Sequence, residues 1–246
     1  MRNSKWIIIA VLSALPFSCF AQCPAPLAKQ VLVSLTDSWN SAHGKAQLFE
    51  RNKDNQWVSI TKPLDTIIGR NGMGWGIGLH EDIEGRYVKK EGDGRSPAGI
   101  FRLLDSFGTN PSSRVETLLT YHQTDKQSRC VDDVNSAYYN SVIYDKREVE
   151  KDWKSFEKLK IAAYEYAVVV DHNRVNSNAK PGHGSCIFLH VKSKKGKPTS
   201  GCTAFALTDM QELISILNSE KNPVLVQLPR SQYLSVQGSW CLPILK

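Results

Sequence analysis

The chain has 246 residues, of which 41% are hydrophobic and 22% are charged, and it contains no low-complexity tract. This composition is ordinary for a globular protein and allows one substantial core or two small ones. The formal net charge of +7 favours acidic partners such as anionic wall polymers, although many solvated proteins are equally basic. Beyond the N-terminus no apolar run is long enough to cross a bilayer, so we expect no stable membrane insertion.

The first 21 residues have the order of a secretory signal. Arg2 and Lys5 precede an apolar run of about a dozen residues, which is followed by small residues of the kind a signal peptidase reads. A lipidated cysteine is less favoured, because Gln22 is a poor neighbour for lipidation at Cys23. We therefore predict a cleaved signal peptide over 1–21 and a single folded domain over 22–246 that is periplasmic or secreted. Export also argues against nucleic acid as a partner.

In chain order, the first elements of the mature chain are predicted to be strands at 31–35, 46–50 and 56–60, with the last two forming a hairpin. The glycine-rich stretch 67–78 is predicted to be a loop; a dinucleotide-binding fingerprint is disfavoured because no helical pattern follows it. A turn-rich loop at 91–99 then leads into a strand at 100–104.

The second half is predicted to mix helices and strands. Apolar residues at helical spacing predict a helix from Glu148 to about Lys160. A second helix is predicted over 208–218, with Thr208 as its cap and Gln211 at the capping-box position. Strands are predicted at 164–170, 185–191 and 223–228, and loops at 171–184 and 192–198. Without repeats or an obvious linker, the pattern indicates one β-rich α+β domain.

The cysteine count points to one free thiol. Six cysteines are present, and one leaves with the signal peptide, so five remain. An oxidising compartment favours pairing, and five is an odd number. Four paired cysteines allow three connectivities. The preferred one joins Cys23 to Cys241 at the two ends of the chain and Cys130 to Cys186, which leaves Cys202 unpaired.

His190 and the segment from Thr199 to Cys202 form the strongest chemical signal. A thiol nucleophile needs a nearby base, and it needs backbone N–H donors where the carbonyl oxygen gains charge. His190 ends a predicted strand, and Cys202 follows a turn formed by Ser200 and Gly201. Gly201 has no side chain to obstruct a substrate carbonyl. A histidine and a cysteine a dozen residues apart are nevertheless often unrelated.

A zinc site is an alternative use of the same region, because His183, Cys186, His190 and Cys202 can all ligate zinc. In an extended strand, Cys186 and His190 would stand about 13 Å apart, at roughly 3.3 Å per residue, which is too far for one ion. We therefore expect no metal and no cofactor.

Several segments resemble one enzyme family. The run Ser96-Pro97-Ala98-Gly99-Ile100-Phe101 resembles the Thr-Pro-x-Gly-x-Phe loop of the L,D-transpeptidase, or YkuD-type, family. His190 followed by Thr199-Ser200-Gly201-Cys202 resembles that family's catalytic signature of a His and then Ser/Thr-His-Gly-Cys. The envelope-protein subgroup is more similar still, through segments that cover most of the mature chain: 92–99, 130–133, 139–140, 169–173, 185–190 and 200–204.

The resemblance implies a fold and a set of roles. The fold would be a single L,D-transpeptidase-like catalytic domain on a β-sandwich with a few flanking helices. Cys202 would be the acyl acceptor and His190 its base, with Gly201 and Ser200 in the oxyanion turn. Ser200 stands where the family's main form has a second His, and Ala204 stands where a polar residue is common.

Three further residues are candidates for substrate binding. Arg95 could pair with a substrate carboxylate, because a guanidinium suits that geometry, or it could form a structural pair with Asp93 or Glu91. His172 and Asn173 could bind the carboxylate of a stem peptide or orient His190. The alternative for both is a polar exit from a strand into a loop.

Taken together, the sequence predicts an exported cysteine L,D-transpeptidase of peptidoglycan, active in cell wall organisation and cell shape. The family chemistry attacks an L,D peptide bond of a stem peptide, releases the terminal D-residue and passes the acyl group to an amine or to water. The amine would belong to a cross-link or to a lipoprotein. Two alternatives stay open: an L,D-carboxypeptidase or amidase on the same scaffold, and a non-catalytic wall-binding module.

Overall fold

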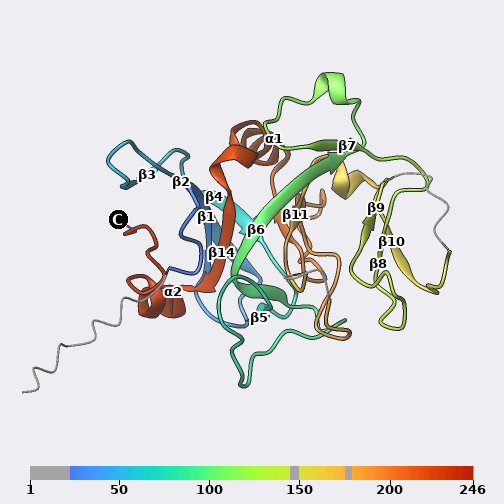
Figure 1. Cartoon of the computed structure of the whole chain (residues 1–246), viewed down its shortest axis with the longest axis horizontal. Helices are drawn as coiled ribbons and strands as arrows, with labels where there is room; N and C mark the ends of the chain where they lie inside the picture. Colours follow the sequence, from blue (N-terminus) through green and yellow to red (C-terminus); the bar gives the residue numbers. More distant parts are fainter. Residues whose placement is uncertain (1–22, 145–149, 175–178, 246) are drawn as a thin grey trace, which may run out of the picture.

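The computed structural model describes residues 23–144, 150–174 and 179–245 (Figure 1). The signal peptide predicted over 1–21 and the start of the helix predicted from Glu148 lie outside these residues. Strands dominate, and the described residues hold two α-helices, α1 (Leu207–Ile216) and α2 (Arg230–Val236). The predicted β-rich α+β class is therefore confirmed. No helix within the described ranges is long and apolar enough to cross a membrane.

The main sheet closes on itself. Its strands follow the order β1-β14-β6-β11-β12-β13-β4-β2-β3, and β1 also pairs with β2, which closes a ring of eight strands and leaves β3 outside. The predicted β-sandwich is thus replaced by a barrel-like sheet, because β1 pairs parallel with β14 and antiparallel with β2 and so has no open edge. The bounds are β1 (Gln30–Thr36), β2 (His43–Arg51), β3 (Trp57–Ser59), β4 (Leu64–Ile67), β5 (Met73–Trp75), β6 (Ser96–Gly108), β7 (Tyr121–Gln123), β11 (Ala167–Val170), β12 (Phe188–Val191), β13 (Thr203–Phe205) and β14 (Val224–Pro229).

Side chains alternate between the inside and the outside of this ring. One hydrophobic cluster takes residues from all eight ring strands and from α1, so it is the interior of the barrel. Leu189 of β12 and Phe205 of β13 belong to it. Because successive side chains of a strand point to opposite faces, His190 and Ala204 face outward. The candidate catalytic residues therefore lie on the outer surface of the barrel.

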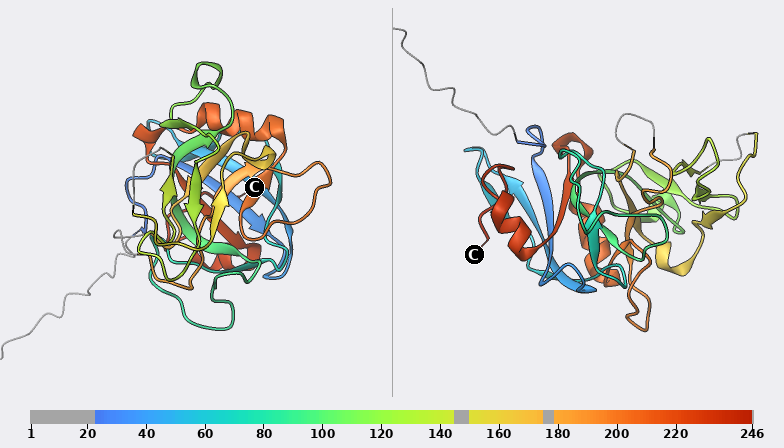
Figure 2. Two further views of the ribbon diagram at one scale, coloured as in Figure 1. Left: turned by 90° about the vertical axis from the view of Figure 1, so that its right-hand side faces the viewer. Right: turned by 90° about the horizontal axis from the view of Figure 1, so that it is seen from below.

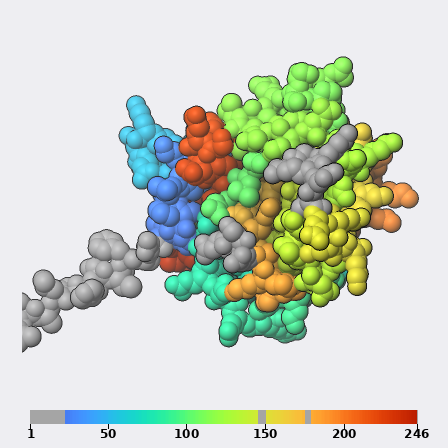
Figure 3. Space-filling view, turned by 45° about the vertical axis from the view of Figure 1, so that its right-hand side comes forward, coloured from blue at the N-terminus to red at the C-terminus, as the bar shows by residue number. Residues whose placement is uncertain are grey.

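A small second sheet covers that outer surface. It consists of β8 (Arg129–Val131), β9 (Val142–Ile143) and β10 (Phe156–Lys158), in the order β10-β8-β9. Its Cys130 and the adjoining Leu159 pack with Val169 of β11 and Phe188 of β12. Figure 2 shows this sheet at the opposite end of the molecule from α2, and in Figure 3 it projects as a lobe beside the orange segment leading into β12.

Two disulfides fix the chain at both ends of the molecule. Cys23 is bonded to Cys241, and Cys130 is bonded to Cys186. This is the connectivity that the sequence favoured, and Cys202 is the free cysteine of the described chain. The first disulfide ties the N-terminus to the segment after α2. The second ties the small sheet to the chain that enters β12, directly beside the predicted site.

The predicted helix over 148–160 is wrong for the residues that the structure describes there. Residues 156–158 form β10 instead, which pairs antiparallel with β8. Trp153 is buried in the adjoining loop, and its helical spacing to Phe156 is coincidental. Backbone hydrogen bonds to β8 stabilise a strand in this segment. The apolar residues at helical spacing have no surface against which a helix would pack.

Other boundaries shift for local reasons. The strand predicted at 185–191 starts only at Phe188, because Cys186 has φ of 55° and turns the chain. The strand predicted at 100–104 is longer, since β6 starts at Ser96. Helix α1 is confirmed, but its cap position is Ala206 without a side-chain cap bond, so the Thr208 cap is wrong. Strands β4, β5, β7, β8, β9 and β13 and helix α2 were not predicted. Three short 3₁₀ helices were not predicted either: η1 (Ser112–Arg114), η2 (Ala162–Tyr164) and η4 (Ser219–Lys221).

Candidate active site

A cavity of about 420 Å³ lies between the outer face of the barrel and the small sheet. All four residues of the predicted catalytic group line it: His190, Ser200, Gly201 and Cys202. Two other cavities of similar volume, about 410 and 440 Å³, are not lined by any cysteine. The cavity beside the small sheet is therefore the one that brings a free thiol and a histidine together.

Cys202 is buried at the base of this cavity, with 8% of its surface exposed. The Phe188 N–H donates a hydrogen bond to Sγ at 3.3 Å, and the thiol faces the Cys186 carbonyl oxygen at 3.5 Å. Burial, together with the negative charge that Glu157 carries when ionised, raises the pKa of this thiol to about 12, although hydrogen bonds from the Phe188 N–H and the Tyr164 hydroxyl act to lower it. The resting sulfur is therefore a neutral thiol.

His190 is a neutral imidazole with its proton on Nδ1. Its Nδ1 lies 2.8 Å from the Val191 carbonyl oxygen, which can only accept a hydrogen bond. Nδ1 therefore carries the proton, and Nε2 has a free lone pair. Burial lowers the pKa of the imidazole, so the ring is neutral at rest. In the parallel pair of β12 and β13, His190 lies opposite Ala204, two residues beyond Cys202.

The turn from Thr199 to Cys202 is fixed by hydroxyl groups. The Thr199 hydroxyl donates to the Cys202 carbonyl at 2.6 Å and accepts from the Gly201 N–H at 3.2 Å. Ser96, at the start of β6, donates to the same Cys202 carbonyl at 3.0 Å. The bond from Ser96 holds the start of the segment at 96–101 against the segment at 199–202. The Gly201 N–H is engaged with Thr199 here, so its role as an oxyanion donor stays a prediction.

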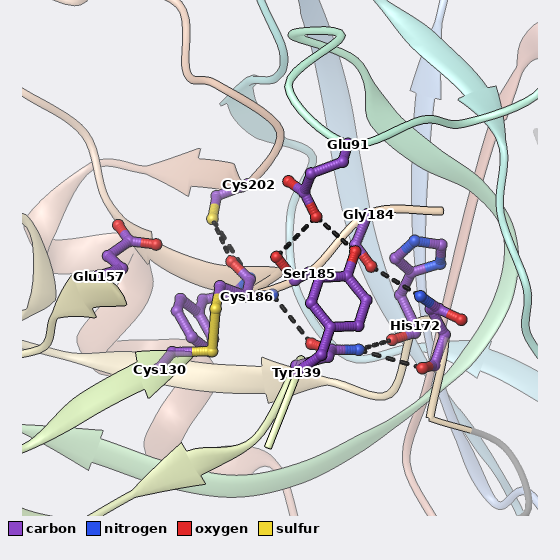
Figure 4. Close-up of a disulfide and its surroundings, with 12 residues drawn as sticks. Glu91, Cys130, Tyr139, Glu157, His172, Gly184, Ser185, Cys186 and Cys202 are labelled. Carbon is purple, nitrogen blue, oxygen red and sulfur yellow. Dashed lines mark hydrogen bonds between the residues drawn. A yellow bond between two sulfur atoms is a disulfide. The ribbon is translucent and has the colours of Figure 1, made fainter. Parts of the chain in front are cut away.

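Tyr164 and Glu157 complete one wall of the cavity, and the sequence did not single out either of them. The Tyr164 hydroxyl is hydrogen-bonded to the Glu157 carboxyl, and it lies within hydrogen-bonding reach of the Cys202 sulfur. Its ring packs edge-on against the His190 ring, with centroids 5.3 Å apart. Glu157 comes from β10, where the sequence predicted a helix, so no spacing signal could have placed it here. Figure 4 shows Glu157 on one side of Cys202 and Glu91 on the other.

Glu91 lines the cavity on the other side of Cys202, and Tyr139 supports it from outside the lining (Figure 4). Glu91 Oε2 accepts hydrogen bonds from the Tyr139 hydroxyl and, at 2.8 Å, from Ser185. The neighbouring Asn140 accepts from the Cys186 N–H at 2.9 Å. This part of the chain therefore holds the loop that presents the Cys186 carbonyl to Cys202.

The three predicted substrate-binding residues lie away from the lining of this cavity. The Arg95 guanidinium donates to the carbonyls of Trp39 and Met73 at 3.1 and 2.8 Å. It also donates to the Asn40 side chain at 2.9 Å. Its backbone N–H, and not its guanidinium, bonds to the Asp93 carboxylate. The structural reading of Arg95 therefore fits the geometry, although with different partners from those expected.

His172 and Asn173 are also built into the framework. The buried His172 ring accepts from the Ile77 N–H at 3.3 Å and contacts the His183 carbonyl at 3.0 Å, and burial lowers its pKa to about 3. The Asn173 amide donates to the Lys180 and Gly184 carbonyls, at 2.9 Å each. Both residues satisfy buried backbone groups of the loop before β12, which matches the polar strand exit considered above.

The zinc alternative loses one of its four donors. Cys186 is bonded to Cys130 and cannot act as a thiolate ligand. No group of three or more His, Cys, Asp or Glu side chains within the described ranges is arranged to hold a metal ion. The Cys186 sulfur therefore belongs to a disulfide, and the Cys202 sulfur is a free thiol.

Fold and cavity together define a barrel-like β protein in which a buried cysteine and a buried histidine line one cavity beside a disulfide-linked small sheet. No protein-family model matches the chain, and no curated protein does. Among solved structures it is similar to Bdellovibrio bacteriovorus Bd1075, with 13% sequence identity and a TM-score of 0.41. The match covers 87% of this chain and 55% of that one, so this chain spans about half of that protein's length.

Proposed function

We propose that this protein is an exported cysteine L,D-transpeptidase with an L,D-transpeptidase-like fold, acting on peptidoglycan stem peptides. One observation carries the proposal: the free thiol of the described chain shares a cavity with a histidine whose Nε2 lone pair is unoccupied. The sequence segments that resemble the family supply the substrate class. The two disulfides support an oxidising compartment, where such a substrate is found.

The chemistry starts from a neutral pair. His190 Nε2 takes the proton from the Cys202 thiol as Sγ attacks the carbonyl carbon of the L,D peptide bond. The C–N bond breaks, the leaving amine takes the proton from His190, and a thioester to Cys202 remains. An amine or water then attacks the thioester carbonyl and gives its proton to His190 Nε2. The C–S bond breaks, the acyl group leaves on the acceptor, and His190 returns the proton to Cys202 Sγ. Burial that disfavours both ions at rest also limits side reactions of the thiol.

The test is intact-protein mass spectrometry of the mature protein after incubation with a tetrapeptide-stem muropeptide. Wild type should gain the mass of the acyl stem, while the Cys202→Ala variant should not. The released products then separate amine from water as the acceptor, and so separate a transpeptidase from a carboxypeptidase. If neither protein forms an adduct or a product, the transpeptidase proposal fails and a wall-binding module becomes the better account.

A further inference from the structure

The described residues around Cys202 include a carboxyl group that the chemistry above does not use. Glu157 lines the same cavity, and its hydrogen-bond partner there is the Tyr164 hydroxyl. Tyr164 is 3% exposed, is hydrogen-bonded to the Glu157 carboxyl and packs edge-on against the His190 ring. It packs with Cys202 in one buried cluster and lies within hydrogen-bonding reach of the sulfur. A single buried hydroxyl thus connects the nucleophile to a titratable group on a different sheet.

The direction of these hydrogen bonds depends on one proton. A hydroxyl has a single hydrogen to donate. An ionised Glu157 only accepts, so Tyr164 must donate to it, and the sulfur then faces an oxygen lone pair. A protonated Glu157 can donate to Tyr164, which frees the Tyr164 hydrogen for the sulfur. The first arrangement favours a neutral thiol, and the second favours a thiolate.

We propose that Glu157, acting through Tyr164, is a positioning residue whose protonation state controls how readily Cys202 becomes a thiolate. In the active form Glu157 keeps its proton throughout the reaction. The Cys202 proton goes to His190 Nε2, and Tyr164 donates to the sulfur that is left negative. When Glu157 ionises, Tyr164 turns to its carboxylate and the sulfur loses this donor.

The surroundings of Glu157 support the protonated form. Burial raises the pKa of Glu157, the hydrogen bond to Tyr164 lowers it, and the nearby Asp132 carboxylate raises it. Asp132 follows β8, and its buried Oδ1 has no hydrogen-bond partner within the described ranges. Across the cavity, the positive charge of Lys89 acts on the sulfur and lowers the pKa of Cys202. Glu157 therefore faces one acid, one phenol and the thiol.

This inference rests on the proposed role of Cys202, but its test does not need the proposed substrate. The rate of Cys202 alkylation by iodoacetamide is measured from pH 5 to pH 10, because the thiolate is the reacting form. The proteins are wild type, Glu157→Gln, Tyr164→Phe and the double variant. Glu165→Gln and Tyr138→Phe are the matched controls, since both residues lie outside the cavity lining.

Glu157→Gln keeps a donor to Tyr164 at every pH. Its alkylation rate should match wild type at low pH, where Glu157 is protonated, and should be about tenfold higher above the pH at which Glu157 ionises, corresponding to one pKa unit of the thiol. Tyr164→Phe should slow alkylation at low pH, where Tyr164 donates to the sulfur, and should abolish the gain from Glu157→Gln at high pH. Wild type should also show a shoulder in its pH profile that Glu157→Gln lacks. A merely structural role for Glu157 would not produce this shoulder.

Two results would overturn the inference. If Glu157→Gln speeds alkylation equally with and without the Tyr164 hydroxyl, the charge acts directly through space and no relay exists. If all variants share one pH profile, or none is alkylated at any pH, Glu157 does not control the thiol. Near-ultraviolet circular dichroism of each variant reports whether it still folds. If Tyr164→Phe does not fold, the shoulder in the wild-type pH profile still tests the proposal. If the muropeptide adduct alone does not form, the proposed substrate is wrong, and the inference about Glu157 is unaffected.

Discussion

Removing the Cys130–Cys186 disulfide should both destabilise the protein and disturb the site. The bond closes a segment with a sequence separation of 56 residues. The chain-entropy relation gives about 4 kcal/mol of stabilisation for a loop of that length. Replacing both cysteines with alanine should therefore lower the unfolding free energy by about that amount, as measured by urea titration.

The Cys23→Ala/Cys241→Ala variant is the matched control. Its sequence separation is 218 residues, for which the same relation gives about 5 kcal/mol. Both variants should lose stability, but only the loss of Cys130–Cys186 should change the reactivity of Cys202. That disulfide joins the strand paired with Glu157 to the residue whose carbonyl faces the Cys202 sulfur.

The assay is the rate of Cys202 alkylation under conditions where each variant is still folded. We expect a change of severalfold for the Cys130→Ala/Cys186→Ala variant and none for the control. If the first variant keeps both the wild-type stability and the wild-type alkylation rate, the small sheet is not held over the site by this bond. An equal change in both variants would mean that the effect on Cys202 follows from general loosening of the fold.

Three further predictions concern the framework around the site. Thr199→Val removes the hydroxyl that fixes the Cys202 turn and should slow acylation of Cys202 about tenfold, judged by the rate of adduct formation, with little change in melting temperature. Gly99→Ala should cost about 2–4 kcal/mol in urea titration, because φ is 140° and a Cβ would lie 1.9 Å from the His80 ring. His172 has a pKa lowered to about 3, so its stability contribution is complete above pH 6.5 and is lost as pH falls from 6.5 towards 3. His172→Gln keeps a hydrogen-bond donor and an acceptor. Between pH 7 and pH 5, its free energy of unfolding should therefore fall by about 2 kcal/mol less than that of wild type. An unchanged pH dependence of the unfolding free energy would contradict a neutral buried His172.

The sequence was informative where a local pattern coincides with a structural constraint. Runs of apolar, β-branched and aromatic residues placed β1, β2, β3, β6, β11 and β14 to within a few residues. The odd number of cysteines predicted one free thiol, and the preferred pairing, which the structure has, left Cys202. Closure of the barrel was not predictable in this way, because it depends on β1 pairing with two strands that are far apart in the chain.

The cavity wall formed by Tyr164 and Glu157 shows where local patterns fail. Tyr164 was read as the first residue of a strand, and it lies instead in the 3₁₀ turn η2 that precedes β11. Glu157 lay inside a predicted helix. Its position depends on the pairing of β10 with β8 and on the bond from Cys130 to Cys186, which are both long-range contacts. A charged residue on a short strand carries no local signal that it will be turned inward.

The polar residues of the segments that resemble the enzyme family show the opposite error. A role in catalysis or binding is easily assigned to residues that instead build the framework. The loop before β12 is buried at Gly184, Ser185 and Cys186, so its backbone groups need partners other than water. The Asn173 amide donates a hydrogen bond to the Gly184 carbonyl, and the Asn140 side-chain oxygen accepts one from the Cys186 N–H. With these groups satisfied, the Cys186 carbonyl is free to face the Cys202 thiol. These polar motif residues affect the surroundings of Cys202 through the backbone that they hold. No spacing rule distinguishes that role from direct contact with a substrate.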